Sequence, residues 1–188
     1  MNRPAKPTPP PPIVRLATDD DVLAMAKVHI ASWRETYPGL LPDPMLAKLS
    51  VASEAIRRQR MLDRPRPLGD ALAFVADQEG EVVAYGSCNE QRTAALHDRG
   101  FTGEVSELYV LRRAQRRGAG SGLMQAMASA LVERGHRAFS LWVLERNAPA
   151  RLFYERLGGA RVAERRAGFA EVAYGWSGRR MSALSQER

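Results

Sequence analysis

Apolar positions along the chain follow two periods, and the change from one period to the other marks the boundaries of the predicted elements. Strand-like runs lie over Ile13–Ala17, Ala71–Asp77, Val82–Cys88, Glu104–Leu111, Arg137–Leu144, Val162–Arg166 and Phe169–Trp176. Helical spacing predicts helices over Thr18–Trp33, Ser53–Leu62, Gly118–Arg134 and Pro149–Leu157. The intervening residues Gln91–Gly100 are predicted to form a loop.

Strands and helices mix along this chain without a strict alternation of one strand and one helix. The short linkers after Asp77 and after Arg166 predict two β-hairpins, and hairpins pair their strands antiparallel. The pattern therefore predicts an α+β fold with a mostly antiparallel central sheet of about seven strands, flanked by about four helices.

The length of 188 residues fits one domain, with a short segment at each end. The first twelve residues hold six of the twelve prolines, which is typical of an extended, unpacked segment. We therefore predict a disordered tail over residues 1–12, a single domain over residues 13–177 and a C-terminal tail over residues 178–188.

Composition places the chain among globular proteins, because hydrophobic residues make up 45% and charged residues 26% of it. No apolar run approaches the roughly 20 residues that a membrane helix needs, and no secretory leader is visible. With Cys88 as the single cysteine, an intramolecular disulfide and a cysteine zinc cluster are both excluded. We expect a cytoplasmic protein with no membrane partner and no metal.

The net charge of +7 is compatible with a nucleic-acid partner or with a phosphate-bearing cofactor. The arginines are spread along the chain, and no basic tract is interleaved with aromatic residues as a base-stacking surface requires. This distribution argues against nucleic-acid binding.

The most informative segment is an arginine-rich turn between the predicted strand ending at Leu111 and the helix that opens with Gly118, Gly120 and Gly122. Glycines admit a ligand close to the backbone, and a helix N-terminus offers unpaired amides, so this segment predicts a pyrophosphate site. A P-loop would need a lysine after the glycines, and a dinucleotide fingerprint would need glycine where Leu123 stands.

What remains is Gln-Arg-Arg-Gly-Ala-Gly over residues 115–120, which follows Leu-Tyr-Val over residues 108–110. This segment resembles the acetyl-CoA signature of the GCN5-related N-acetyltransferases (GNAT). A second segment, Leu141–Gly158, resembles the family's strand, asparagine, short helix, Phe-Tyr and glycine in that order. A weaker likeness covers His29–Pro42, similar to the opening helices of many bacterial members. The resemblance extends from about Ile13 to Trp176.

The resemblance implies a role for each matching residue in binding acetyl-CoA, which leaves as coenzyme A. Backbone groups of Leu108, Tyr109 and Val110 would pair with the pantetheine arm, where the sheet is expected to splay from Leu141–Leu144. Asn147 would hydrogen-bond that arm, and Tyr154 would protonate the departing thiolate. The pyrophosphate would bind the backbone of Gln115, Arg116, Arg117, Gly118, Ala119, Gly120 and Ser121.

The acceptor side is less determined by the sequence. A protonated amine must lose a proton before it attacks, and a carboxylate is the usual base. Glu104 matches the position of a strand glutamate that serves as base in some family members, and Glu107 is the second choice. Strand alternation puts these two on opposite faces unless a bulge intervenes. The family's first helices cover the acceptor end, so Trp33 and Tyr37 are expected to line it.

We therefore expect an acyltransferase that moves the acetyl group of acetyl-CoA to a primary amine by direct attack through a tetrahedral intermediate. The acceptor, a small molecule or a peptide, stays open, and the resemblance allows a homodimer through the C-terminal strands. Two other functions stay open as well, an acetyl-CoA sensor without catalysis and a basic nucleic-acid-binding protein.

Overall fold

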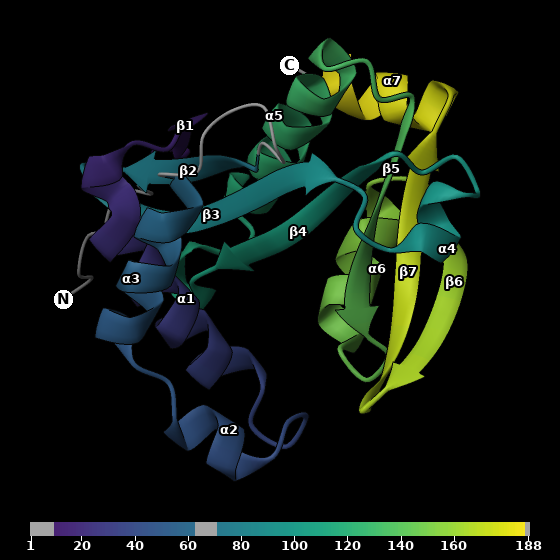
Figure 1. The fold of residues 1–188 in the computed structure, drawn as a ribbon. Coiled ribbons are helices and arrows are strands. Elements are labelled where there is room, and N and C mark those ends of the chain that lie inside the picture. The colour runs from purple at the N-terminus through teal and green to yellow at the C-terminus, as the bar shows by residue number, and fades with distance from the viewer. Residues whose placement is uncertain (1–9, 63–70, 187–188) are drawn as a thin grey trace, which may run out of the picture.

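The computed structural model describes residues 10–62 and 71–186, so most of the predicted N-terminal tail lies outside the described residues. Its centre is a seven-stranded sheet in the order β1-β2-β3-β4-β5-β7-β6 (Figure 1). The pairing of β4 with β5 is parallel and the other five pairings are antiparallel. The strands are β1 (Ile13–Leu16), β2 (Leu72–Gln78), β3 (Glu81–Glu90), β4 (Gly103–Val110), β5 (Ala138–Leu144), β6 (Ala160–Ala167) and β7 (Phe169–Ser177). The predicted fold class is confirmed.

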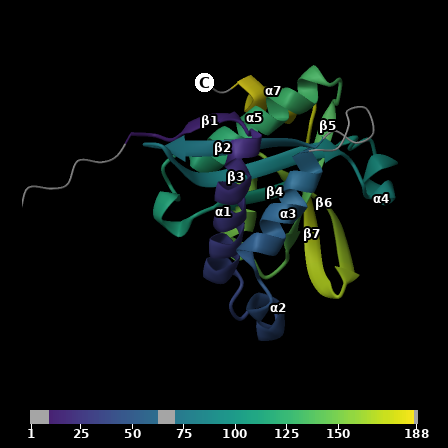
Figure 2. The ribbon, with the colours of Figure 1, turned by 60° about the vertical axis from the view of Figure 1, so that its left-hand side comes forward.

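Helices cover both faces of this sheet (Figure 2). One face, which we call the α1 face, carries α1 and α3 over strands β2 to β4, and the opposite α5 face carries α5, α6 and α7. The described residues form α1 (Val22–Thr36), α2 (Asp43–Ala47), α3 (Val51–Leu62), α4 (Ala94–His97), α5 (Ala119–Glu133), α6 (Ala148–Arg156) and α7 (Arg179–Gln186). Two short 3-10 helices, η1 (Asp19–Asp21) and η2 (Arg112–Ala114), precede α1 and α5.

The entry into α1 shows how local sequence sets the structure. Thr18 and Asp21 form a reciprocal capping box at the start of η1, as the threonine followed by acidic residues predicts. Asp21 also accepts two hydrogen bonds from Arg15 of β1, at 2.6 and 2.8 Å. The same carboxylate therefore caps the helix and fastens it to the edge strand.

Two expectations from the sequence are wrong. The predicted loop over Gln91–Gly100 contains helix α4, and the predicted C-terminal tail over residues 178–188 contains helix α7. Met181 and Leu184 of α7 are buried, and the hydroxyl of Ser129 in α5 donates to the carbonyl of Ser185. A three-residue spacing of two apolar side chains is a weak helical signal, and the α5 surface that buries them was not visible in the sequence.

The sheet is splayed between its two central strands, as the sequence predicted (Figure 1). Strands β4 and β5 pair only at Gly103–Phe139 and Glu104–Ser140. Beyond these pairs β4 stays bonded to β3, and β5 stays bonded to β7. Among residues 10–62 and 71–186, no strand therefore pairs with the edge of β4 from Val105 to Val110 that faces β5.

A β-bulge in β4 changes which face its side chains occupy. Glu107 pairs with Ser87 of β3, whereas Val105 pairs with the adjacent Cys88, so Ser106 is an additional residue in the ladder. Glu104 pairs with Asn89, two residues from Ser87, and residues two apart on a strand share a face. The bulge thus places Glu104 and Glu107 on the same α1 face.

The packing of α7 gives a test of this correction. Replacement of Leu184, which is 3% exposed, by alanine should lower the free energy of unfolding by about 2 to 4 kcal/mol, because it leaves a cavity against α5. Urea denaturation monitored by circular dichroism measures this loss. Leu152, which is 52% exposed on α6, is the matched control, and its alanine variant should stay within about 0.5 kcal/mol of the parent. Equal stabilities of the two variants would show that α7 does not pack.

Candidate functional site

The turn before α5 has the geometry of an anion site. Arg116 has a φ of +61° and Gly118, the N-cap of α5, has a φ of +87°. A left-handed residue in such a turn directs neighbouring amides toward one point, and the first amides of a helix have no acceptor within it. The hydroxyl of Ser121 donates to the Gly118 carbonyl at 3.1 Å. The amides around Gly118 are thus arranged for a bound anion.

The unpaired edge of β4 leads toward this turn. Leu108, Tyr109 and Val110 are half-buried rather than sealed in the core. The Gln115 side chain donates to the Val110 carbonyl at 3.3 Å, which connects the end of the strand to the turn. A Cβ added to Gly120 would lie 3.1 Å from Cζ of Phe153 and 3.6 Å from Cγ2 of Val110. The strand edge, the turn and α6 therefore converge at Gly120.

Helix α6 contributes two of the expected residues. Asn147 is its N-cap and accepts a hydrogen bond from the amide of Ala150 at 3.3 Å. Tyr154 is buried beside Phe153 and Tyr174, with ring centroids 5.4 and 6.0 Å away. Burial raises the pKa of Tyr154, and Tyr37 raises it further. The Tyr154 phenol therefore keeps its proton at neutral pH and is close enough to Tyr37 to interact electrostatically.

Glu107 is held by two guanidinium groups. Arg58, which is 1% exposed, donates to Oε2 of Glu107 at 3.0 Å, and Arg57 donates to Oε1 at 2.9 Å. Burial alone would raise the pKa of Glu107, but the charge and hydrogen bonds of these arginines lower it to about 2. A carboxylate with so low a pKa binds protons weakly, which argues against Glu107 as the general base.

The buried Arg58 guanidinium also organises the groups around it. It lies 2.5 Å from Glu54 and 3.0 Å from Nδ1 of His29, and it contacts the Tyr85 hydroxyl. His29, Glu54 and Glu107 together have the side chains of a metal site, with ligand atoms within 4.8 Å of one another. Arg58 occupies the position between them and supplies the positive charge there. Burial lowers the pKa of His29 to about 4, so this histidine is neutral at pH 7.

Glu104 has a different environment on the same face. It is buried and accepts hydrogen bonds from the backbone amide, Nε and Nη2 of Arg92, at 3.0, 3.1 and 2.8 Å. Its single guanidinium partner is two-thirds exposed, unlike the buried Arg58. Glu104 is therefore held less firmly by its arginine partner than Glu107 is held by Arg57 and Arg58.

Trp33 and Tyr37 continue an aromatic row along α1. The ring centroids of His29 and Trp33 are 5.1 Å apart, and those of Trp33 and Tyr37 are 4.9 Å apart. His29 also contacts Tyr109 of β4 edge-on at 4.8 Å. Burial raises the pKa of Tyr37, and the charge of Glu171 on β7 raises it further. The row therefore runs from the buried Arg58 cluster toward the β7 side of the splay.

Comparison with known proteins agrees with this geometry. A model of the acetyltransferase (GNAT) family matches residues 30–159. The chain belongs to the GNAT family. It is 32% identical to an uncharacterized N-acetyltransferase of Bacillus subtilis, YuaI, over 87% of this chain and 91% of that protein.

Solved structures show the same fold. The PaiA N-acetyltransferase of Thermoplasma acidophilum, in complex with coenzyme A, superposes with a TM-score of 0.66 at 17% identity, over 88% of this chain and 99% of that one. YncA of Salmonella typhimurium, solved with its cofactor acetyl-CoA, superposes with a TM-score of 0.62 at 16% identity, over 88% and 93%. At these identities the likeness concerns the fold.

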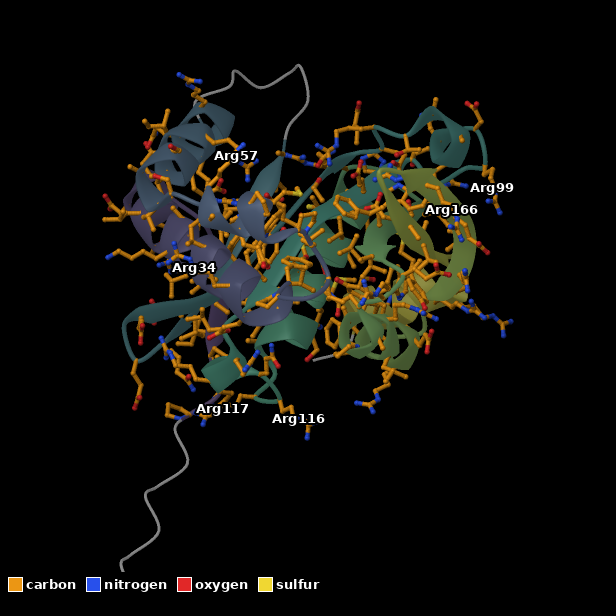
Figure 3. All side chains as sticks on the ribbon, turned by 90° about the horizontal axis from the view of Figure 1, so that it is seen from below. Arg34, Arg57, Arg99, Arg116, Arg117 and Arg166 are labelled. Carbon is orange, nitrogen blue, oxygen red and sulfur yellow. The ribbon has the colours of Figure 1, made fainter. Side chains whose placement is uncertain are left out.

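The GNAT fold brings most of the expected residues together and divides them between two sides. Residues 108–110 and 115–121, with Asn147 and Tyr154, surround the splay and its turn, whereas Glu104, Glu107, Trp33 and Tyr37 belong to the α1 face. Figure 3 shows Arg116 and Arg117 on one side of the molecule and Arg57 on the other. In the described part of the chain, no helix is both long and apolar enough to cross a membrane.

The sequence analysis did not identify the arginines that pair with the carboxylates of the α1 face. Glu54, Arg57 and Arg58 stand at the i, i+3 and i+4 spacing of a helical ion-pair network, and this signal was present in the sequence. Their link to Glu107 depends on the packing of α3 against β4, which spacing alone does not reveal.

The Glu107 cluster predicts how stability depends on pH. The folded-state pKa is lowered from an ordinary 4.5 to about 2, so the contribution of Glu107 is complete above about pH 4.5 and is lost as the pH falls through 2. A shift of this size corresponds to about 3 kcal/mol. Glu107→Gln should therefore be less stable than the parent at pH 7, and its stability should fall less between pH 4.5 and 2. Urea denaturation across this range measures both effects.

Glu81→Gln provides the control, because Glu81 is exposed and pairs with the exposed Arg113. Its stability profile should parallel that of the parent chain. A Glu107→Gln profile that also parallels the parent would show that the two arginines do not hold this carboxylate ionised.

Proposed function

We propose that this protein is an acetyl-CoA-dependent N-acetyltransferase that moves the acetyl group to a primary amine by direct attack. The observation that carries the proposal is the continuous path from the unpaired edge of β4 to the amides before α5. The PaiA and YncA structures, which share the fold, hold coenzyme A and acetyl-CoA respectively. Membership of the GNAT family supports the same assignment.

The residues on this path fit the parts of acetyl-CoA. The backbone of Leu108–Val110 can pair with the extended pantetheine arm as an added strand would. The amides of residues 115–121 can receive the pyrophosphate at the positive end of the α5 dipole. Asn147 is the N-cap of α6, directly after β5, and in this proposal its side chain hydrogen-bonds the arm.

The reaction needs one bond made, one bond broken and two protons moved. The amine nitrogen attacks the thioester carbonyl carbon, and a backbone amide of β4 stabilises the negative oxygen of the tetrahedral intermediate. The carbon–sulfur bond then breaks, and the neutral Tyr154 phenol donates a hydrogen bond or its proton to the departing thiolate. The nitrogen gives one proton to a base before it attacks and a second proton as the intermediate collapses. The second proton restores the Tyr154 phenol, and the acetamide and coenzyme A leave.

Glu104 is the proposed base for the amine proton. An amine with a pKa near 10 arrives protonated at pH 7, so a group on the acceptor side must accept a proton. Glu104 lies on the α1 face next to the point where β4 and β5 separate, and one exposed arginine holds it. A water between Glu104 and the amine would complete the transfer. Glu107, fixed by Arg57 and Arg58, stabilises the bulge instead.

Binding of acetyl-CoA tests the cofactor assignment. At a concentration 100 times its dissociation constant, acetyl-CoA should stabilise the folded protein by about 2.7 kcal/mol, visible as a rise in Tm. ATP, NAD and a DNA duplex should give no such shift. Gly120→Val should lose the shift, because its side chain would occupy the space before the α5 amides.

Two control variants isolate the cause. Gly120→Val combined with Phe153→Leu removes the close contact to Phe153 and should still lack the shift. Gly135→Ala, after the C-terminal end of α5, should lower Tm but keep the shift, since its φ of +86° is strained for alanine and lies far from the turn. A full shift in Gly120→Val would refute the pyrophosphate assignment. A shift with the DNA duplex instead of acetyl-CoA would favour a nucleic-acid-binding protein.

The role of Tyr154 predicts a kinetic effect without a binding effect. Tyr154→Phe should lower kcat by about 10²-fold and leave acetyl-CoA affinity nearly unchanged, because the ring stays and only the proton donor is lost. Steady-state kinetics with a reactive primary amine, together with calorimetric titration of acetyl-CoA, separates the two. Tyr174→Phe is the control. The Tyr174 hydroxyl donates to Glu155 of α6, so this variant should retain kcat. An unchanged kcat in Tyr154→Phe would remove this residue from the mechanism.

A further inference from the structure

Two exposed arginines stand over the buried carboxylates of β4. The Arg57 side chain on α3 is 55% exposed, and that of Arg92, between β3 and α4, is 67% exposed. The carboxylates that they cover, Glu107 and Glu104, are 13% and 8% exposed. The outer layer of this surface therefore consists of guanidinium groups, and the carboxylates form the layer beneath.

A third arginine repeats this arrangement on the other side of the splay. Arg165 of β6 donates to Glu171 of β7 at 2.7 Å, and the arginine is the more exposed partner. Its guanidinium carbon lies 4.1 Å above the centre of the Trp142 ring. Stacking on Trp142 and pairing with Glu171 fix the direction of this guanidinium.

Strand register places these carboxylates on one face of the sheet. Glu104 pairs with Ser140 of β5, and Trp142, two residues further, shares its face. Trp142 pairs with Ala173, which lies two residues from Glu171, and Glu171 pairs with Arg165. Because paired residues point to the same side, Arg165 occupies the α1 face together with Glu104 and Glu107. The β3 residues that pair with Glu104 and Glu107 are two positions apart, about 7 Å, so the two carboxylates are neighbours on this face.

Each arginine keeps donors available after its ion pair is made. Arg92 binds Glu104 through Nε and Nη2, and Arg57 binds Glu54 through the same two nitrogens. Within the described residues, Nη1 of Arg57 and Arg92 and both Nη atoms of Arg165 donate no hydrogen bond. A guanidinium carries five N–H groups, so its end can still receive a second planar anion.

The carboxylates of this face are already paired with arginines, so they offer little attraction to an acceptor with several positive charges. Glu54, Glu104, Glu107 and Glu171 are each paired with at least one arginine. A polycation would have to displace these arginines, which would leave their guanidinium groups, including the buried one of Arg58, without a partner. The charge of the face therefore favours an anionic group on the acceptor.

We propose that the acceptor amine carries a carboxylate or a phosphate, and that Arg57, Arg92 and Arg165 receive this anionic group on the α1 face. The inference rests on the proposed acetyl transfer and names its substrate class. The rest of the acceptor would lie between the rings of Trp33 and Tyr37 on α1 and the ring of Trp142 on β5.

Matched pairs of acceptors test the proposal. Each free amino acid is compared with its own carboxamide, and O-phosphoethanolamine with ethanolamine, by kcat/KM at saturating acetyl-CoA. For at least one pair, kcat/KM of the anionic acceptor should exceed that of its neutral counterpart by tenfold or more. Comparison of the amino acid pairs with the phosphate pair shows which anion is used. A carboxamide has the lower amine pKa and more free amine, so a preference for the acid does not arise from deprotonation.

Variants locate the preference. Arg57→Gln, Arg92→Gln and Arg165→Gln should each reduce the ratio of anionic to neutral kcat/KM by about tenfold, since each loses a charge-assisted hydrogen bond. Arg161→Gln is the matched control. Arg161 lies on the same strand as Arg165, is equally exposed and is also ion-paired, but its backbone pairs with Tyr174 on the opposite face. Its ratio should equal that of the parent.

Calorimetry gives a second measurement that does not require turnover. The protein saturated with coenzyme A should bind the preferred anionic acceptor about tenfold more tightly than its neutral counterpart, and Arg165→Gln should remove this difference. Equal kcat/KM within every pair, or an Arg165→Gln ratio equal to that of Arg161→Gln, would overturn the proposal while leaving acetyl transfer intact. Loss of the acetyl-CoA shift in the parent chain would instead refute the proposed function.

Discussion

Strands β4 and β5 hydrogen-bond at two residue pairs and then separate. The arrangement of the candidate site on the two sides of the splay follows from this separation. Backbone N–H and C=O groups require partners when they are buried, and within the described residues no strand pairs with the half-buried edge Leu108–Val110 on the β5 side. β3 and β7 hold the two strands in the sheet, so the gap persists without a ligand. An extended ligand can complete this edge, and the turn at Gly118 lies where the ligand's anionic end would arrive.

The bulge at Ser106 and the buried Arg58 are coupled. The bulge turns Glu107 toward the α1 face, and Arg58 on α3 receives it there. A buried guanidinium without its carboxylate costs about 3 to 5 kcal/mol, so neither α3 nor the bulge can shift independently. Helix α3 therefore fixes the conformation of β4 just before Leu108–Val110. Burial beside this network lowers the pKa of His29 and leaves it neutral, and the contact of His29 with Tyr109 links the aromatic row of α1 to β4.

The sequence predicted the strands, the long helices and the splay, because each depends on local periodicity or on two contiguous motifs. It did not predict α7, whose two buried side chains become a signal only when the α5 surface is known. Nor could it decide between Glu104 and Glu107, because a single additional residue at Ser106 reverses the alternation beyond it. Arg58 was missed for a related reason. Its helical spacing to Glu54 is local, but its decisive partner, Glu107, is 49 residues away.

In the two proposals above, anion recognition and proton removal both involve Arg92. Its guanidinium holds Glu104 through Nε and Nη2, and its other end is free to receive an anion of the acceptor. When two anions share one guanidinium, each is stabilised less than it would be alone, so the bound acceptor weakens the hold of Arg92 on Glu104. Glu107 does not respond in this way, because the buried Arg58 retains it whether or not an acceptor is bound.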